Sequence, residues 1–206
     1  MILSNRELHA ALDEGRITIT PEPTPRVPEV AGGHCPYDTH SVDLTLGTEI
    51  SVPTNPGCIT VDLSNPGNIA QHIQQHSTPH TITREQPYVL EPCKFILAKT
   101  RELVHLPIVD GCEICLAARI EGKSSRARFG LLVHFTAPTV HPGFKGTLTL
   151  EIINLGPCKI SLSPGLPIAQ LIVEEVKGCP FRNPSQFQGQ TTAAGLAANG
   201  QAKPSI

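Results

Sequence analysis

The chain has 206 residues, which is enough for one sizeable hydrophobic core and favours a single domain. Its formal net charge of -2 at pH 7 provides no overall attraction to nucleic acid or to an anionic membrane. With 20 prolines, 17 glycines and no tryptophan, the composition predicts many turns and short strands around a core of Val, Ile, Leu and Ala.

The N-terminal stretch predicts a short helix. Ser4 and Glu7 form a capping-box pattern, and Leu8 and Ala11 then follow at helical spacing until Gly15 can end the helix. The stretch lacks a basic start followed by an apolar signal core, and nowhere does the chain contain about 18 consecutive apolar residues. We therefore expect a cytoplasmic protein with neither a membrane nor a nucleic-acid partner.

Most of the remaining chain has the pattern of short strands. Residues 20–36 contain five prolines and predict a surface loop without regular structure. After this loop the apolar residues recur with a period of two. The strand candidates are 42–46, 58–63, 88–90, 94–100, 113–120, 131–136, 147–153, 159–162 and 168–173. Many short strands at short spacing predict an all-β protein with short helices, folded as a jelly-roll-like barrel.

Two groups of residues raise the question of a metal site. His72 and His76 would share one face of a helical turn near His80, but their neighbours are Gln, Ser and Thr without an acidic ligand. We interpret this stretch as a solvated polar loop. Cys112 and Cys115 lie three positions apart on a predicted strand and therefore point to opposite faces. The seven dispersed cysteines are interpreted as reduced, and no protein-bound metal is expected.

Residues 121–128 are typical of a phosphate site. Ser124 and Ser125 can cap a short helical turn whose free backbone N–H groups face outward. Three basic side chains surround that positive end: Lys123, Arg126 and Arg128.

A single carboxylate among apolar residues is a candidate proton shuttle. Glu151 shares one strand face with Thr147 and Thr149, while leucines and isoleucine occupy the other face. The alternative is a structural carboxylate that pairs with Arg128 and only stabilises the fold.

Together these segments resemble the dCTP deaminase family of the dUTPase-like superfamily. The motifs that carry the resemblance are Gly-Lys-Ser-Ser-x-x-Arg at 122–128, Val-His-Phe-Thr-Ala at 133–137, His-Pro-Gly-Phe-Lys-Gly at 141–146, Thr-Leu-Glu at 149–151 and Phe-Gln-Gly-Gln at 187–190. The resemblance begins at the first residues and covers nearly the whole chain. It implies a dUTPase-like distorted jelly-roll barrel that forms a homotrimer with active sites between subunits.

The resemblance also implies a division of the chain and a set of roles. One domain spans 1–187, and a C-terminal tail, 188–206, closes over the nucleotide; its composition predicts mobility without ligand. Glu151 would be the general base and acid, Ser124 and the carbonyl of Ala137 would hold the water, and Arg128 would orient the site. The positions implied to bind substrate are Lys123, Ser125, Arg126, Ala127, Thr136, His141, Thr149, Phe181, Gln186 and Gln190.

The implied activity is hydrolysis of dCTP to dUTP and ammonia in pyrimidine deoxynucleotide supply, with Mg²⁺ arriving on the triphosphate. Zinc is not expected, because the chain lacks the His-x-Glu of zinc deaminases and its Cys-x-x-Cys follows glycine instead of proline.

Four departures from the family pattern leave alternatives open. His141 replaces an aspartate, Phe181 and Phe187 replace tyrosines, and Gln186 replaces a phosphate-binding lysine. A bifunctional deaminase and dUTP diphosphatase, or a dUTPase, is one alternative, and His141 argues against it. A non-catalytic nucleotide-binding regulatory protein is another alternative, and retention of the proton shuttle Glu151 argues against it.

Overall fold

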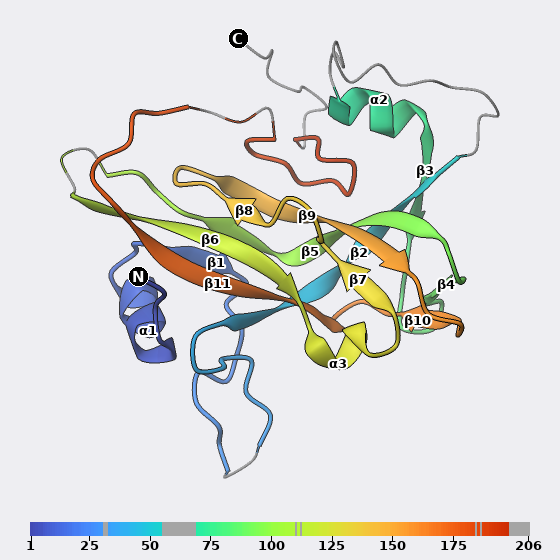
Figure 1. The fold of residues 1–206 in the computed structure, drawn as a ribbon, viewed down its shortest axis with the longest axis horizontal. Coiled ribbons are helices and arrows are strands. Elements are labelled where there is room, and N and C mark those ends of the chain that lie inside the picture. Colours follow the sequence, from blue (N-terminus) through green and yellow to red (C-terminus); the bar gives the residue numbers. More distant parts are fainter. Residues whose placement is uncertain are drawn as a thin grey trace.

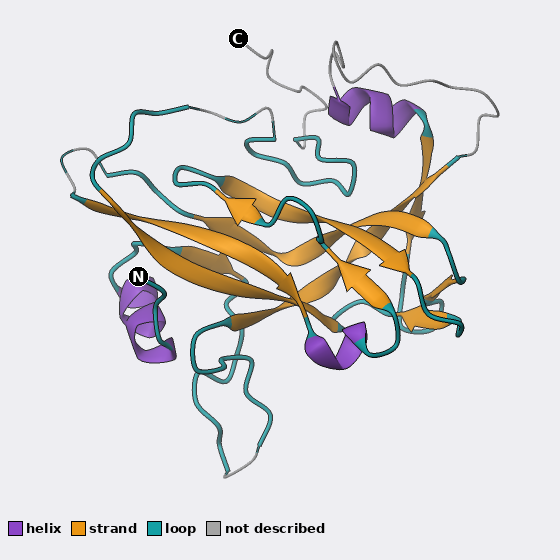
Figure 2. Ribbon diagram, viewed as in Figure 1, coloured by secondary structure: helices purple, strands orange, loops and turns teal. Residues whose placement is uncertain are grey.

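The computed structural model describes residues 1–30, 33–54, 69–109, 111, 113–183, 185 and 187–197. Strands dominate, and the three helices of this described part are short and lie outside the sheet (Figure 2). In chain order the elements are α1 Asn5–Asp13, β1 Thr18–Thr20, β2 Val42–Pro53, α2 Ile69–Gln75, β3 Ser77–Thr81, β4 Tyr88–Leu90, β5 Phe95–His105, β6 Ile114–Gly122, α3 Ser124–Ala127, β7 Leu131–Val133, β8 Thr139–Val140, β9 Lys145–Asn154, β10 Ile160–Leu162 and β11 Pro167–Lys177.

The main sheet is antiparallel and curls on itself into a half-barrel (Figure 1). Its strand order is β7-β9-β5-β2-β11-β6-β8, with β1 beside β5 and β3 beside β2; β4 and β10 form a separate pair. The pairing register shifts on β2 between Leu46 and Ile50 and on β5 between Lys99 and Leu103. Such irregularities bend a strand and increase its twist, which curls the sheet.

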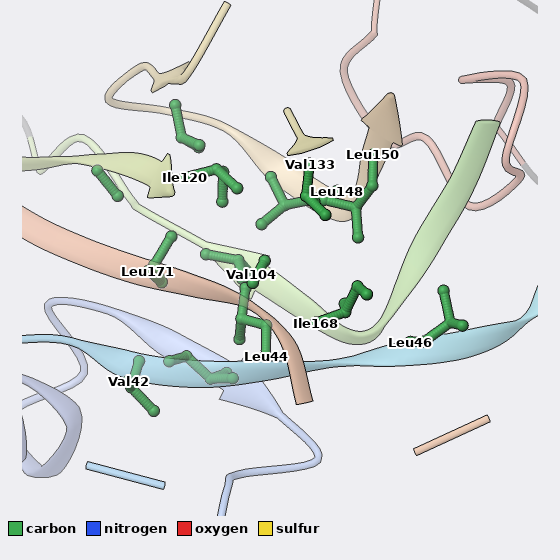
Figure 3. Close-up of a cluster of buried hydrophobic side chains, with 14 of the residues drawn as sticks. Val42, Leu44, Leu46, Val104, Ile120, Val133, Leu148, Leu150, Ile168 and Leu171 are labelled. Atoms are coloured by element: carbon green, nitrogen blue, oxygen red, sulfur yellow. The ribbon is translucent and has the colours of Figure 1, made fainter. Parts of the chain in front are cut away.

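The hydrophobic core lies inside this curl. On β9, Leu148, Leu150 and Ile152 are buried and alternate with half-buried residues, as a period of two predicts. Figure 3 shows the side chains of Leu148 and Leu150 among others from β2, β5, β6, β7 and β11. Each fully buried Leu or Ile stabilises the fold by about 1.5–3 kcal/mol. The same alternation leaves Thr149 and Glu151 on the opposite face of β9.

The N-terminal helix forms as predicted. The Ser4 hydroxyl accepts from the backbone N–H of Glu7 over 3.3 Å, which satisfies one of the free donors at the helix start. Leu8 and Ala11 are buried on the core side, and Gly15 follows with a φ of 70°. No helix of the described part of the chain is both long and apolar enough to cross a membrane.

The predicted strands are confirmed where they fall on described residues, with differences in length. The candidate 131–136 ends at Val133, because His134 takes a left-handed conformation with a φ of 53°. Candidate 94–100 continues to His105 as β5, and 168–173 continues to Lys177 as β11. Candidate 58–63 lies outside the described residues.

The helical turn considered around His72 forms, whereas the solvated loop expected as far as His80 is wrong, because His80 lies on a strand. His72 lies on α2 and His80 on β3, which pairs with β2. The rings of His72 and His76 are 4.5 Å apart, and that of His80 lies 6.0 Å from Tyr88. Cross-strand pairing with β2 therefore gives residues 77–81 a regular structure that their polar composition did not indicate.

Candidate active site

A cavity of about 520 Å³ lies beside the solvent face of β9. Its polar wall includes Glu151 and Thr149 from β9, His134 and Ala137 from the β7–β8 connection, and His141 from the β8–β9 turn. Its apolar wall comes from Leu97, Ile108, Val140, Phe144 and Leu148. An apolar hollow with a few converging polar groups is the usual form of a small-molecule site.

Glu151 and His134 form the chemical centre of this cavity. The Nδ1 atom of His134 lies 2.6 Å from Oε2 of Glu151, and 35% of the Glu151 side chain is exposed. Burial raises the pKa of Glu151, but the contact with His134 and its positive charge when protonated outweigh burial and leave this pKa below the ordinary 4.5. The cavity therefore holds a carboxylate that is ionised at neutral pH. A carboxylate in that form can accept a proton.

The backbone conformation of His134 is part of this arrangement. Its φ of 53° ends β7, and its backbone N–H donates to the carbonyl oxygen of Glu151 over 2.8 Å. The side chain and the main chain of His134 are thus both held to Glu151. This pairing follows from the β7–β9 register, in which Val133 lies opposite Ile152.

Thr149 adds an unsatisfied polar group to the cavity wall. Its hydroxyl oxygen is buried and has no hydrogen-bond partner among the described residues. A buried hydroxyl without a partner costs about 1–3 kcal/mol. Thr149 lines the cavity, and its role in binding substrate stays a prediction.

The basic segment that predicts a phosphate site lies elsewhere on the chain. Ser124, Ser125 and Arg128 are exposed on or beside α3 and do not line the cavity of Glu151. In Figure 1, α3 lies at the end of β6 and β7, away from the red C-terminal segment. One chain therefore divides the predicted catalytic residues into two groups, with Glu151 and Ala137 in the cavity and Ser124 and Arg128 outside it.

The prediction that Ser124 and Ser125 cap this helix is wrong in detail. The cap position is Lys123, whose ψ of 126° is extended, and no side chain caps the helix. Both serines lie within the first turn instead, because the chain is already helical at Ser124. The ammonium group of Lys123 pairs with the largely buried carboxylate of Asp43 on β2. Lys123 therefore anchors α3 to the sheet.

Two glycines allow the backbone just after α3 to lie in close contact with the backbone just after β9. A Cβ atom on Gly156 would lie 1.9 Å from the carbonyl oxygen of Phe129, and one on Gly130 would lie 2.2 Å from the backbone nitrogen of Gly156. Asn154 is fully buried, and its side-chain oxygen accepts from the N–H of Gly156 over 2.9 Å. Backbone contact at this point sets where α3 leaves the sheet.

The other predicted binding residues have different placements. Gln190 is buried, lines the cavity and donates through Nε2 to the carbonyl oxygen of Thr147 over 2.8 Å. Phe181 is 88% exposed and does not line the cavity. Ala127 lines a smaller hollow with Phe135, whereas Gln186 lies outside the described residues. Thr136 is exposed in the loop that carries Ala137, and Arg126 is half-buried on α3.

Glu151 pairs with His134 and not with Arg128, the partner considered in the structural alternative. His134 belongs to the motif at 133–137, but no catalytic or binding role was predicted for it. Its signal was an ionisable side chain within the predicted strand 131–136, and the partner strand could not be deduced from local pattern.

The described residues contain no group of three or more His, Cys, Asp or Glu side chains able to hold a metal ion. Cys115 lies buried on β6, while Cys112 lies outside the described residues. The absence of zinc from the reaction stays a prediction.

The curled antiparallel sheet and its cavity with a carboxylate–imidazole pair define an all-β protein with a small-molecule site. The fold is similar to that of 2'-deoxycytidine 5'-triphosphate deaminase from Agrobacterium tumefaciens, with a TM-score of 0.56 and 17% sequence identity over 85% of this chain and 47% of that chain. This chain thus spans about half the length of that solved structure.

Sequence comparison narrows the class to a family. The model of the dCTP deaminase-like family matches residues 2–176. A dCTP deaminase of Thermomicrobium roseum is 37% identical over 185 residues, covering 88% of this chain and 85% of the relative. A "dCTP deaminase, dUMP-forming" of Methanosphaera stadtmanae is 32% identical over 200 residues, covering 92% of this chain and 90% of the relative. The chain belongs to the dCTP deaminase-like family.

Proposed function

We propose that this protein is a dCTP deaminase, a hydrolase that converts dCTP and water to dUTP and ammonia for pyrimidine deoxynucleotide supply. The observation that carries the proposal is Glu151, a carboxylate in the cavity whose pKa is kept below its ordinary value by His134 despite burial. A general base must begin the reaction without a proton, and Glu151 meets this requirement at neutral pH.

The residues of the cavity can hold the attacking water and transfer the protons that deamination of cytosine requires. A water oxygen forms a bond to C4 of the cytosine while Glu151 takes a water proton. Glu151 delivers this proton to ring N3, then takes the remaining proton from the new C4 hydroxyl and passes it to the exocyclic amine. Cleavage of the C4–N bond releases ammonia and leaves a carbonyl at C4. The backbone carbonyl of Ala137, on the same cavity wall, is the expected acceptor for the attacking water.

The proposal includes a homotrimer with active sites between subunits. Ser124 and Arg128 are expected to act at the reacting centre, but one chain keeps them outside the cavity of Glu151. A neighbouring copy would supply α3 to complete the site. The exposure of Phe129 (65%) and Phe135 (47%) near α3 supports this assembly, because apolar side chains gathered on a surface mark contact sites.

The proposal assigns metal only to the substrate. Mg²⁺ would enter with the triphosphate, whose charge Lys123, Ser125 and Arg126 are expected to meet, and zinc would take no part. The location would be cytoplasmic. Cys35, Cys93, Cys158 and Cys179 are free thiols, as is usual in a reducing compartment.

A second candidate product is dUMP. Several relatives, among them that of Methanosphaera stadtmanae, are named "dCTP deaminase, dUMP-forming", which favours this candidate. His141, in the cavity wall, argues for dUTP instead, because an imidazole does not supply the negative charge that a carboxylate would give to a water molecule or a metal ion.

One assay tests both candidates. The protein is incubated with dCTP and Mg²⁺, and separately with dUTP and Mg²⁺, while ammonia and pyrophosphate are followed independently. We expect ammonia from dCTP with little pyrophosphate from either nucleotide. Pyrophosphate in step with ammonia would establish the dUMP-forming activity, and the absence of both products would refute the proposed function.

A further inference from the structure

The described part of the C-terminal tail, 188–197, is packed against the sheet. Gly189 donates its N–H to the carbonyl oxygen of Lys145 over 2.8 Å, and Thr147 donates to the carbonyl oxygen of Gln190 over 3.0 Å. A Cβ atom on Gly146 would lie 2.8 Å from that same oxygen of Gln190. The tail therefore lies directly on β9 at a position where glycine is required.

Beyond Gln190 the tail forms a small closed loop. Thr191 donates its N–H to the carbonyl oxygen of Leu196 over 2.7 Å, and Leu196 donates to the hydroxyl of Thr192 over 2.9 Å. Ala193 and Leu196 are 0% and 2% exposed. The loop therefore buries its small apolar side chains.

Glu49 on β2 and Lys99 on β5 form an ion pair that hydrogen-bonds to backbone groups of this loop. The ammonium group of Lys99 donates to the carbonyl oxygen of Thr191, and the N–H of Ala193 donates to Oε1 of Glu49 over 2.7 Å. Lys99 Nζ and Glu49 Oε2 are 3.5 Å apart, with 21% and 29% of the two side chains exposed. Hydrogen bonds to charged groups are about twice as strong as neutral ones.

The loop held in this way forms part of the wall of the Glu151 cavity. Gln190 and Gly195 both line it, and the ring of Phe187 lies next to Gly195. Neither Glu49 nor Lys99 lines the cavity, so any effect of the pair on the site acts through the tail.

We propose that Glu49 and Lys99 are positioning residues that latch the tail against the cavity, so that Gln190 is held as part of the cavity wall. The pair supplies one donor and one acceptor to backbone groups two residues apart, a geometry that seats the loop in a single register. The expected effect on dCTP turnover rests on the proposed function, whereas the position of the tail can be tested without assuming that function.

The seating is tested by hydrogen exchange on the full chain without nucleotide. We expect the amides of Ala193 and Thr147 to be protected in the wild type and to exchange at least about tenfold faster in Lys99→Met and Glu49→Ala, because both variants lose a charge-assisted bond. The matched control is the exposed pair Lys159 and Glu91, whose nitrogen and oxygen are 2.7 Å apart. Lys159→Met should leave both amides protected.

Gly146→Ala provides a test that changes no charge. Its methyl group must displace the backbone of Gln190, so the Ala193 amide should exchange faster here too. Wild-type amides that exchange at unprotected rates, or protection in Lys99→Met equal to that of the wild type, would overturn the latch.

Kinetics with dCTP and Mg²⁺ then separate positioning from general stability. A tail seated only part of the time raises KM in inverse proportion to the seated fraction and leaves kcat at saturating nucleotide nearly unchanged. We expect a KM at least about threefold higher in Lys99→Met, with a melting temperature close to that of the wild type and of Lys159→Met. A fall in kcat alone would contradict the positioning role. If the Ala193 and Thr147 amides exchange faster in the variants but the wild-type protein does not deaminate dCTP, the proposed function is refuted and the role of Glu49 and Lys99 in holding the tail is still supported.

Discussion

Glu151 is held by His134 through both its side chain and its main chain. Nδ1 of His134 lies 2.6 Å from Oε2 of Glu151, and the N–H of His134 donates to the carbonyl oxygen of Glu151 over 2.8 Å. The backbone hydrogen bond holds the main chain of His134 beside Glu151, and the left-handed φ of 53° orients the side chain toward the carboxylate. His134 is therefore the main group that lowers the pKa of Glu151 against the effect of burial.

Replacing His134 should move the pH dependence of catalysis. Burial raises the pKa of Glu151, and His134 lowers it to below 4.5. In His134→Asn the opposing contact is lost while burial remains, so the pKa of Glu151 should rise. We expect the acid limb of kcat/KM to shift to higher pH, measured between about pH 4 and pH 9. His40→Asn, an exposed histidine away from the cavity, should leave the limb in place; an unmoved limb in His134→Asn would contradict the assignment.

The same shift predicts the sign of the stability change. Because the folded-state pKa of Glu151 is lowered, its contact with His134 stabilises the fold above the ordinary value of 4.5 and is lost as the pH falls through the lowered pKa. The stability difference between wild type and Glu151→Gln should therefore shrink on acidification. Urea unfolding at several pH values measures it.

Glu151→Gln should retain the fold and nucleotide binding while lowering turnover by at least about 10²-fold, the usual scale of general acid–base catalysis. The amide keeps the size of the side chain but cannot accept a proton. Ammonia release at saturating dCTP measures the change, and Glu91→Gln on the surface is the control. Near-normal turnover from a folded Glu151→Gln protein would remove Glu151 from the mechanism.

Mixing two inactive variants tests whether sites form between chains. Arg128→Ala and Glu151→Gln each disable one of the two separated groups of predicted residues. If α3 of one copy completes the cavity of another, unfolding and refolding the two variants together should restore part of the activity, since some sites then contain both intact residues. Each variant refolded alone should stay inactive. No recovery from a mixed oligomer, verified by differently tagged chains, would place both groups in one chain's site.

Gly156→Ala should destabilise the protein and displace the end of α3. Its methyl group would lie 1.9 Å from the carbonyl oxygen of Phe129, so the backbone must move. Overpacking of this kind costs about 1–3 kcal/mol, measured as a lower melting temperature. Gly122→Ala is the matched control, because its methyl group would meet Val133 at an ordinary 3.6 Å. Equal stability of the two variants would show that the Gly130–Gly156 contact can relax.

Local patterns predicted the features that depend on local geometry. The capping residues placed α1, and the alternation on β9 placed Glu151 and Thr149 on the face opposite the core. Both predictions hold because a helix cap and a strand face are set by residues within a few positions of each other. The basic segment was located for the same reason, although its cap is Lys123 instead of a serine.

The sequence by itself determined the all-β class, the element positions and the two chemical groups, Glu151 on a strand and the serine–arginine segment on a short helix. Only the tertiary structure decided their neighbours. His134 reaches Glu151 through the β7–β9 register, and Lys99 reaches Thr191 across 92 positions of sequence. Such contacts depend on how distant strands pair and curl, and side-chain periodicity specifies the face of a strand but not its partner.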